Sequence, residues 1–298
     1  MPIERAGETA DRAIESVLNQ QASFPFELIL ISAEPLPERA GSRNVVERNR
    51  NPATRRNRGV SASSGEILAF IDDDAIAAPD WLSTAIGYLD AHPLVLALGG
   101  PDPAPADSSI RELISETLLA TPLIGSGIAA HENRPGVFAL TSPSDVALVN
   151  LFVRRSVFSG FDESIGYIGE DTALIDGIMK QGMVVYHGAV RVEHRRRPFA
   201  GPYLRQRWRY RVKTGRMLAR GAYRDDRRIR RFVVAAIVML LLAPILIAPY
   251  VIATLLLGAR VTRLPVKYWM VIPAAFALHH LTYFFGIVWG YLRGKMHI

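Results

Sequence analysis

The chain has 298 residues, of which 49% are hydrophobic and 21% are charged, enough to bury a full domain and leave residues over. It contains no cysteine, which excludes a disulfide framework and any metal site built from thiolates. Its net charge of +7 conceals an asymmetry: residues 1–194 carry 15 Lys/Arg against 26 Asp/Glu, whereas residues 195–298 carry 20 against 2. An acidic body joined to a basic and apolar tail predicts a soluble domain seated on an anionic membrane face, with nucleic acid as the competing partner of the basic run.

The N-terminal region is predicted to form a helix over residues 8–20 and a strand over residues 26–31. In an α/β protein a strand is expected ahead of such a helix, and residues 1–7 are polar and too short to be a signal peptide. We therefore expect either that the true start lies upstream of Met1 or that the domain has lost one edge of its pocket.

Residues 35–51 are rich in Pro, Arg and Asn, which predicts a loop. The next segment, residues 53–63, is predicted to form a basic helix that carries Arg55, Arg56 and Arg58.

The apolar run over residues 67–71 predicts a buried strand, because it is short, β-prone and bounded by turn residues. It ends abruptly in Asp72, Asp73 and Asp74. Clustered acids at the end of a strand mark the place where an open α/β fold binds a ligand, and adjacent carboxylates need a cation such as Mg²⁺ or Mn²⁺. The alternative is a solvated acidic turn that caps the helix beginning near Asp80.

The elements that follow alternate as in an α/β sheet. They are a helix over residues 80–91, a strand over residues 94–98, a helix over residues 110–119 and a strand over residues 146–153. The segment from residue 121 to residue 143 is predicted to be a long loop of the kind that holds functional sites.

A second acidic pair, Glu170 and Asp171, opens a helix that runs to residue 181, after a loop that contains several glycines. Carboxylates in a first helical turn complement the helix dipole, which is a structural reason for them. Against that, a glycine-rich approach to two acids is how a reactive carboxylate is presented at the edge of a cleft. Two short strands, residues 184–186 and 189–193, then lead to His194.

The C-terminal third predicts a membrane anchor. Residues 203–231 are basic and aromatic, a pattern typical of a helix at a membrane interface. Two apolar stretches follow, residues 232–257 and 268–292, each long enough to cross about 30 Å of hydrocarbon. The second contains His279 and His280, for which packing between helices is preferred over a functional role. Because the cationic residues concentrate before the first span, the positive-inside rule places the acidic domain in the cytoplasm.

The predicted organisation has four parts. They are a domain over residues 1–200, a basic amphipathic interfacial segment over residues 201–231, a transmembrane hairpin over residues 232–292 and a tail over residues 293–298.

Several of these segments resemble glycosyltransferase family 2. They are RAIESVLNQ (residues 12–20), RNRGVSASSGEILAFIDDDAIAAPDWL (residues 56–82), GFDESIGYIGEDTALIDGIMKQG (residues 160–182) and VEHRRRP (residues 192–198). FIDDD followed by GEDT at this spacing is specific in combination, and the resemblance covers roughly residues 2–216. It implies an α/β GT-A fold, Rossmann-like with a mixed central sheet, here followed by two C-terminal transmembrane helices. It also implies an inverting enzyme that uses a nucleotide-sugar donor.

The resemblance assigns the first acidic cluster to the donor and metal. Asp74 matches the metal ligand of the family's DxD motif, and Asp72 would lie near the nucleotide ribose or the metal. Asp73 and Arg58 are expected in the same donor site. The divalent cation would be Mg²⁺ or Mn²⁺.

The resemblance assigns the second acidic pair to the acceptor. Asp171 matches the catalytic base, and Glu170 beside it would contact the acceptor or donor sugar. His194 sits where many GT-A enzymes offer a further metal or diphosphate ligand; the alternative is a histidine that caps a strand end. The following arginines, residues 195–197, would bind either phosphate or lipid head groups.

The sequence departs from the family pattern in three places. The family's first strand and its Pro-x-Tyr-Asn survive as Pro2-Ile-Glu-Arg, and the acidic pair after the second strand is replaced by Ser32 and Ala33, so uridine recognition is not implied. RQRW at residues 205–208 is reminiscent of the QxxRW signature of processive members, but its spacing differs.

The expected function is metal-dependent transfer of a hexosyl group from a nucleotide sugar to a lipid-linked or cell-envelope polysaccharide acceptor at the cytoplasmic (inner) membrane. The alternative is a catalytically impaired relative that acts as a membrane-bound partner of another glycosyltransferase. Nucleic acid is a poor partner, because the basic segment abuts a membrane span and the body is acidic.

Overall fold

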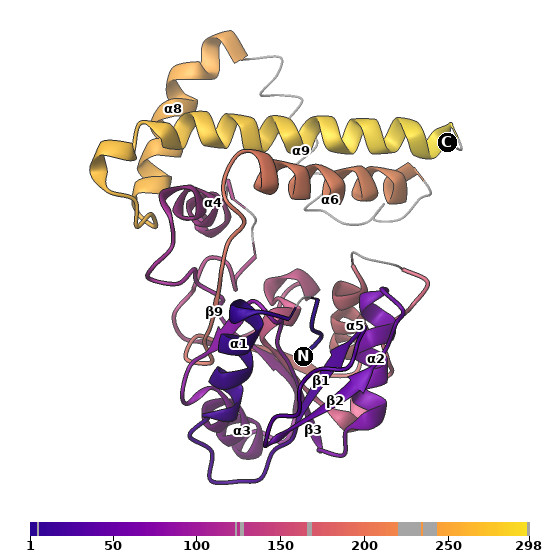
Figure 1. The fold of residues 1–298 in the computed structure, drawn as a ribbon. Coiled ribbons are helices and arrows are strands. Elements are labelled where there is room, and N and C mark those ends of the chain that lie inside the picture. The colour runs from indigo at the N-terminus through magenta and orange to yellow at the C-terminus, as the bar shows by residue number, and fades with distance from the viewer. Residues whose placement is uncertain are drawn as a thin grey trace. The chain divides into compact units, whose positions relative to one another are not determined.

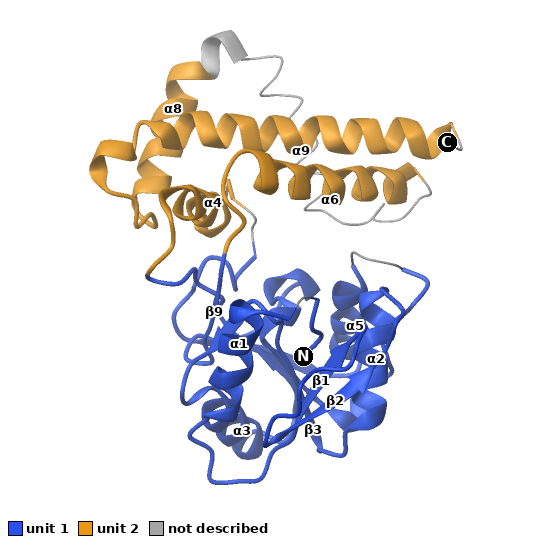
Figure 2. Ribbon diagram, viewed as in Figure 1, with its two compact units in different colours: residues 1–106, 127–195 blue, residues 107–126, 196–298 orange. Residues whose placement is uncertain are grey.

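The computed structural model describes residues 1–4, 6–122, 124–125, 128–165, 169–219, 234 and 243–296. The chain forms two compact units, shown in blue and orange in Figure 2. Unit 1 comprises residues 1–106 and 127–195, and unit 2 comprises residues 107–126 and 196–298. Residues 107–126 group with the C-terminal part of the chain, which the sequence does not predict.

Unit 1 is built on a five-stranded mixed sheet with the order β3-β7-β5-β8-β6. Its strands are β3 (Ile67–Phe70), β7 (Leu151–Arg154), β5 (Val95–Gly99), β8 (Met183–His187) and β6 (Val137–Ala139). Strands β5 and β8 run parallel, whereas β3–β7, β5–β7 and β6–β8 are antiparallel pairs. Two further pairs complete the unit: β1 (Leu28–Ser32) is parallel to β2 (Ser42–Val46), and β4 (Ala75–Ala77) is antiparallel to β9 (Val192–His194). The predicted α/β class with a mixed sheet is confirmed.

Helices cover both faces of this sheet. Helices α1 (Glu8–Leu18) and α3 (Trp81–Ala91) share one hydrophobic cluster with Phe152, whereas α2 (Pro52–Ala62) and α5 (Glu170–Met179) share another with Leu151 and Val153. Successive side chains of a strand point to opposite faces, so neighbouring residues of β7 serve different clusters. Three short 3-10 helices, η1 (Pro143–Asp145), η2 (Leu148–Asn150) and η3 (Arg155–Val157), flank β7.

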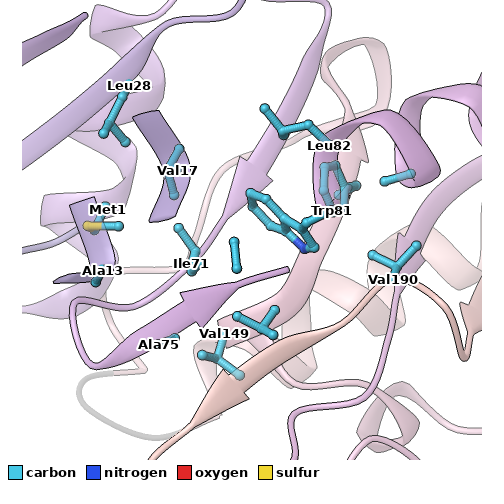
Figure 3. Close-up of a cluster of buried hydrophobic side chains, with 14 of the residues drawn as sticks. Met1, Ala13, Val17, Leu28, Ile71, Ala75, Trp81, Leu82, Val149 and Val190 are labelled. Carbon is cyan, nitrogen blue, oxygen red and sulfur yellow. The ribbon is translucent and has the colours of Figure 1, made fainter. Parts of the chain in front are cut away.

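Trp81 occupies the centre of the first cluster (Figure 3). Its ring centroid lies 4.7 Å from that of Phe152, and its indole N–H donates a 2.8 Å hydrogen bond to Oδ1 of Asn150. The amide of Asn150 in turn donates to the carbonyl oxygens of Pro101 at 3.0 Å and Val190 at 2.7 Å. A single buried side chain therefore holds together two loops that are distant in the sequence, and both lead into the candidate site.

Three predictions of local structure were wrong. Residues 42–46 were assigned to a loop but form β2, and residues 137–139 of the long loop form β6. The strand predicted over residues 146–153 is shorter, because η2 precedes β7. Strand β2 has the sequence SRNVV, without an apolar run; it is held by pairing with buried β1 and by the amide of Asn44, which donates to the carbonyl of Leu30 at 3.2 Å. Both missed strands depend on partners elsewhere in the chain.

The N-terminal residues pair with β1 in the place where a preceding strand was expected. Pro2 forms a parallel bridge with Ile31, the Ile3 amide donates to the Ile31 carbonyl at 2.7 Å, and the Ile31 amide donates to the Met1 carbonyl at 3.0 Å. Met1 and Ile3 are buried in the first cluster. A short strand segment therefore lies at this edge of unit 1.

Unit 2 is helical among its described residues. Its helices are α4 (Ile110–Ala120), α6 (Gly201–Ala219), α8 (Ala243–Ala259), the 3-10 helix η4 (Val266–Tyr268) and α9 (Val271–Lys295). Within the described part of the chain, α9 is the one helix whose length and composition would allow it to cross a membrane, whereas two spans were predicted. Residues 220–231 of the interfacial segment, and most of residues 232–242 at the start of the first predicted span, lie outside the described residues.

Candidate active site

The predicted acidic cluster lies where β3 ends and β4 begins. Buried Ile71 completes the apolar run, and the chain then passes through Asp72, Asp73 and Asp74 before it enters β4. Strand β4 pairs with β9 so that Ala75 lies opposite His194. This register brings Oδ1 of Asp74 to 3.4 Å from Nε2 of His194. Two residues that the sequence analysis proposed as metal ligands are therefore neighbours.

Two further residues, Asp102 and His131, extend this contact, and the sequence analysis missed both. Asp102 is fully buried; its Oδ2 lies 3.5 Å from Nδ1 of His194, and its Oδ1 lies 2.8 Å from Nδ1 of His131. Both ring nitrogens of His194 thus face carboxylates. Asp102 belongs to a proline-rich loop after β5, where sequence alone carries no signal for a buried acid.

The backbone around Asp102 is held by close chain crossings. The His194 amide donates to the Pro103 carbonyl at 2.8 Å, and the Asp102 amide donates to the Ala130 carbonyl at 3.3 Å. A Cβ placed on Gly100 would lie 1.9 Å from the carbonyl oxygen of Val190, so only glycine fits where these two loop segments cross. Val190 is distant in the sequence, so local sequence patterns do not predict this crossing.

Asp73 shows that the cluster carries excess negative charge. The pKa of Asp73 is raised to about 6, mainly by burial and also by the neighbouring carboxylates of Asp74 and Asp72, while a hydrogen bond from the Glu4 amide at 2.6 Å opposes the shift. A carboxyl group with such a pKa is poorly stabilised as an anion by the protein alone. A bound cation would relieve this repulsion.

Arg56 connects the first acidic cluster with the second. Its Nη1 lies 2.9 Å from Oε1 of Glu170, and its Nη2 lies 3.3 Å from Oδ1 of Asp72. The Arg56 and Glu170 side chains are 11% and 7% exposed, so this bridge is largely shielded from water. Arg58, which the sequence analysis placed in the donor site, is exposed on α2, and its role stays a prediction. Of the arginines of this helix, Arg56 is the one that reaches the acidic residues, whereas Arg55 is buried and donates to the Asn49 carbonyl at 2.9 Å.

The loop before α5 is fastened to α2. The side chain of Asn57 donates to the Phe161 carbonyl at 2.9 Å and accepts from the Phe161 amide at 2.8 Å, while the carboxylate of Glu163 accepts from Thr54 at 2.6 Å. The chain reaches α5 through Gly169, whose φ of +98° favours glycine. Residues 166–168 of this loop lie outside the described residues.

Asp171 occupies the first turn of α5, next to Glu170. Its Oδ1 accepts a 2.7 Å hydrogen bond from the Thr172 amide, and its side chain is half-buried. Because Arg56 ties the adjacent Glu170 to Asp72, the structure brings the start of α5 to the acidic end of β3. The hypothesis that Asp171 is a reactive carboxylate requires α5 to begin near the acidic cluster, and the Arg56 contacts meet this requirement.

The described residues contain no three carboxylate or imidazole groups that already converge on one point as a metal site does. The donor set nevertheless suits a hard divalent cation, since Asp74 offers an oxygen and His194 a nitrogen at the same edge. Asp102 behind His194 is the carboxylate partner that a metal-binding imidazole usually has.

Comparison with protein families decides the kind of domain to which this edge belongs. Residues 1–138 match the model of Glycosyl transferase family 2. Over these residues the chain is similar to family 2 glycosyltransferases. The matched residues contain Asp72 to Asp74, Asp102 and His131, whereas Glu170, Asp171 and His194 lie beyond the match. The roles of those three residues therefore rest on the geometry described above.

Two curated proteins are similar to part of this glycosyltransferase domain. A glucosyl-dolichyl phosphate glucuronosyltransferase of Haloferax volcanii is 30% identical over 104 residues, covering 31% of this chain and 33% of that protein. The succinoglycan biosynthesis protein ExoO of Rhizobium meliloti is 30% identical over 125 residues, covering 39% of this chain and 36% of that protein. The chain thus spans about a third of the length of these relatives.

A solved structure resembles more of the chain. The mannosyltransferase PcManGT of Pyrobaculum calidifontis, in complex with GDP-Man and Mn²⁺, superposes with a TM-score of 0.54 at 16% identity, covering 95% of this chain and 85% of that one. At this identity the likeness concerns the fold, which is that of a GT-A glycosyltransferase.

Proposed function

We propose that the chain is an inverting glycosyltransferase that moves a sugar from a nucleotide-sugar donor to a lipid-linked or cell-envelope polysaccharide acceptor. The observation that carries the proposal is the Arg56 bridge, which joins the acidic end of β3 to the acidic start of α5. An inverting transfer needs a base for the acceptor hydroxyl on one side of the reacting carbon and, on the other, carboxylates that hold a cation for the departing diphosphate. Arg56 brings the elements that carry them together.

Asp171 is the proposed general base. Inverting transfer is a single displacement at the anomeric carbon, and the acceptor hydroxyl must lose its proton as it attacks. A half-exposed carboxylate in the first turn of a helix can approach an incoming hydroxyl. Glu170, held by Arg56, is placed to orient a sugar hydroxyl beside it. The two acids of the pair thus take different tasks because one is already paired with an arginine.

Asp74, with Asp72 and His194, is proposed to hold Mg²⁺ or Mn²⁺ against the donor diphosphate. When bound, this cation would act as a Lewis acid that stabilises the departing diphosphate. The support is the contact between Asp74 and His194 and the raised pKa of Asp73. PcManGT was solved with GDP-Man and Mn²⁺, which agrees with a nucleotide sugar and a divalent metal in this fold.

The acceptor is proposed to be attached to, or to grow at, a membrane. One relative is named for a dolichyl phosphate substrate and the other for the biosynthesis of a polysaccharide. Unit 2 brings an apolar helix of 25 residues and a cationic helix to the same chain. The concentration of cations before the first apolar stretch favours the cytoplasmic face.

The catalytically impaired alternative is not favoured. It rested on the absence of a first strand, but residues 1–3 pair with β1 and are buried in the core of unit 1. The acidic residues that resemble the DxD and ED motifs, Asp72 to Asp74 and Glu170 with Asp171, are also present.

The direct experiment is to incubate membranes that contain the chain with a panel of nucleotide sugars and to measure released nucleoside diphosphate. We expect release with one donor, dependent on Mn²⁺ or Mg²⁺. Asp74→Asn should abolish the stimulation of donor binding by Mn²⁺, which a donor titration with and without the metal would measure. A variant that responds to Mn²⁺ as the parent does would contradict the metal assignment.

A further inference from the structure

Helices α6 and α9 of unit 2 pack along each other over most of the length of α6. Figure 1 shows them side by side, and the contacts run in register: Tyr203 Oη lies 2.7 Å from Nδ1 of His279, and Val212 lies against Gly290. Residue numbers increase in the same direction on both helices, so they are parallel. The pair begins near the middle of α9 and continues to its C-terminal end.

Glycine makes this contact close. Gly286, Gly290 and Gly294 recur every four residues on α9 and form one face. A Cβ on Gly290 would lie 2.0 Å from the carbonyl oxygen of Val212, and a Cβ on Gly215 of α6 would lie 2.1 Å from that of Ile287. The two backbones therefore touch, and α6 occupies the same depth as the half of α9 beside it.

Helix α6 carries a high positive charge at that depth. Within α6 and α9 there are eight Lys/Arg and no Asp/Glu. Arg211 lies with its guanidinium 3.8 Å from the centroid of the Tyr283 ring, at the middle of α9. Arg205, Arg209 and Arg216 are exposed on the outer surface of α6. If α9 crossed a bilayer, Arg205 and Arg209 would face the hydrocarbon, which is among the most unfavourable environments for arginine, whereas Arg216 lies beside Gly294 at the end of α9.

The surface of α9 opposite the glycine face is apolar. Leu278, Leu281, Phe285, Val288 and Leu292 are all 38–50% exposed and follow the three- and four-residue spacing of one helical stripe. A helix with an apolar stripe on one side and a cationic partner on the other is typical of proteins that lie in the interface of a membrane.

A shallow groove on one flank of the helix pair is lined by the kinds of residue that are found at membrane interfaces. It has a volume of about 380 Å³ and is lined by Trp208, Arg209, Val212, Lys213, Arg216, Trp289 and Arg293. Tryptophan is enriched at the head-group level of membranes, and arginine and lysine bind lipid phosphates there.

We propose that α6 and α9 lie together in the plane of an anionic membrane surface, with the apolar stripe of α9 among the acyl chains and the cations of α6 among the lipid phosphates. In this arrangement α9 does not cross the bilayer and its two ends lie at the same face, unlike the second membrane span that the sequence predicts. The complementary partner is a bilayer rich in anionic phospholipid, because the pair has no acid of its own to balance its charge.

The test uses the absence of cysteine from the chain, which allows single cysteines to be introduced in the full-length protein. Lys267→Cys and Lys295→Cys place one exposed thiol before α9 and one at its end, and Leu94→Cys reports the side of unit 1. Each variant is treated with a membrane-impermeant maleimide in sealed vesicles of either orientation. We expect all three thiols to react from the same face. Reaction of the two α9 thiols from opposite faces, or failure of either to react from the face of Leu94→Cys, would overturn the proposal.

A second measurement examines how deeply each helix lies in the membrane. Spin labels are attached to Phe285→Cys on the apolar stripe and to Arg209→Cys on α6, in membranes of phosphatidylcholine and phosphatidylglycerol. For each label, the rate of collision with oxygen is compared with the rate of collision with a water-soluble nickel complex. The label at position 285 should meet oxygen and the label at position 209 should meet nickel. Equal access of both labels to oxygen, which a membrane-crossing pair requires, would contradict the planar arrangement. A chain that stays in the supernatant when membranes are sedimented would contradict the membrane partner altogether.

Discussion

In unit 1 acidic side chains gather at one edge of a sheet and share the bridging Arg56, whereas in unit 2 several arginines lie against aromatic rings and Arg263 pairs with Glu116. Arg56 contacts both Asp72 and Glu170, while Arg207 lies 5.3 Å from the Tyr203 ring centroid and Arg293 lies 4.7 Å from that of Trp289. An aromatic face attracts a cation without neutralising it. Unit 1 therefore retains negative charge for a cation from outside, and unit 2 retains positive charge for an anionic surface.

Under the proposed function, the two acidic motifs and the basic segment would serve one reaction. Carboxylates would hold the cation for a diphosphate donor, and the basic segment would keep the catalytic domain near a membrane-attached acceptor. Four substitutions test this contrast between the units.

Replacing the proposed base should have the largest effect. Asp171→Asn is expected to lower kcat by roughly 10²–10⁴-fold, because the amide cannot accept the acceptor proton, while donor binding stays near that of the parent. The measurement is turnover at saturating donor together with a donor titration. Asp176→Asn is the matched control, since Asp176 lies on the same helix and pairs with Lys180 at the surface. Undiminished turnover of Asp171→Asn would remove the base assignment.

Breaking the arginine bridge should destabilise unit 1. Arg56→Gln leaves the buried Glu170 carboxylate without its ion pair, and we expect the free energy of unfolding to fall by about 3 kcal/mol. Arg58→Gln, two residues away and exposed, should change it by less than about 0.5 kcal/mol. Urea denaturation followed by tryptophan fluorescence compares the two. Equal losses for both variants would mean that the bridge is not what holds α5 to the end of β3.

Replacing Asp102, which faces His194, should weaken metal binding. Asp102→Asn keeps the size of the side chain but removes the charge that faces His194 and His131, so Mn²⁺-dependent donor binding is expected to weaken by about 10- to 100-fold. Titration with Mn²⁺ at a fixed donor concentration measures this loss of affinity. Asp90→Asn, at an exposed position of α3, serves as the control. A folded Asp102→Asn protein with the Mn²⁺ affinity of the parent would separate Asp102 from the site.

Removing one exposed cation from unit 2 should have the smallest effect. Arg209→Gln is expected to reduce the preference for anionic over neutral vesicles by about 1 kcal/mol, or roughly five-fold. Arg48→Gln, an exposed arginine of unit 1, should leave the preference unchanged. The measurement is the partition of each variant between anionic and neutral vesicles at equal lipid concentration. Equal effects of Arg209→Gln and Arg48→Gln would mean that the cations of unit 2 bind anionic lipid no better than those of unit 1.

Much of unit 1 could be predicted because its signals are local. The apolar run before Asp72, the stripe of α1 and the glycine-rich approach to Glu170 each lie within one segment, and the structure places a strand or helix at each. Residues 42–46 lack such a signal and form β2 because β1 is beside them. Local periodicity reports which face of an element is buried, but it does not report a partner that is distant in the sequence.

The sequence by itself determined the α/β class, the two acidic motifs and the division into an acidic body and a basic, apolar tail. The tertiary structure decided which residues meet. Arg56 rather than Arg58 faces the acids because packing sets the rotation of α2, and Asp102 reaches His194 because the chains cross at Gly100 with no room for a side chain. Likewise, the glycines of α9 were visible as a repeat, but only the packed helices show that a cationic partner fills that face and denies it to lipid.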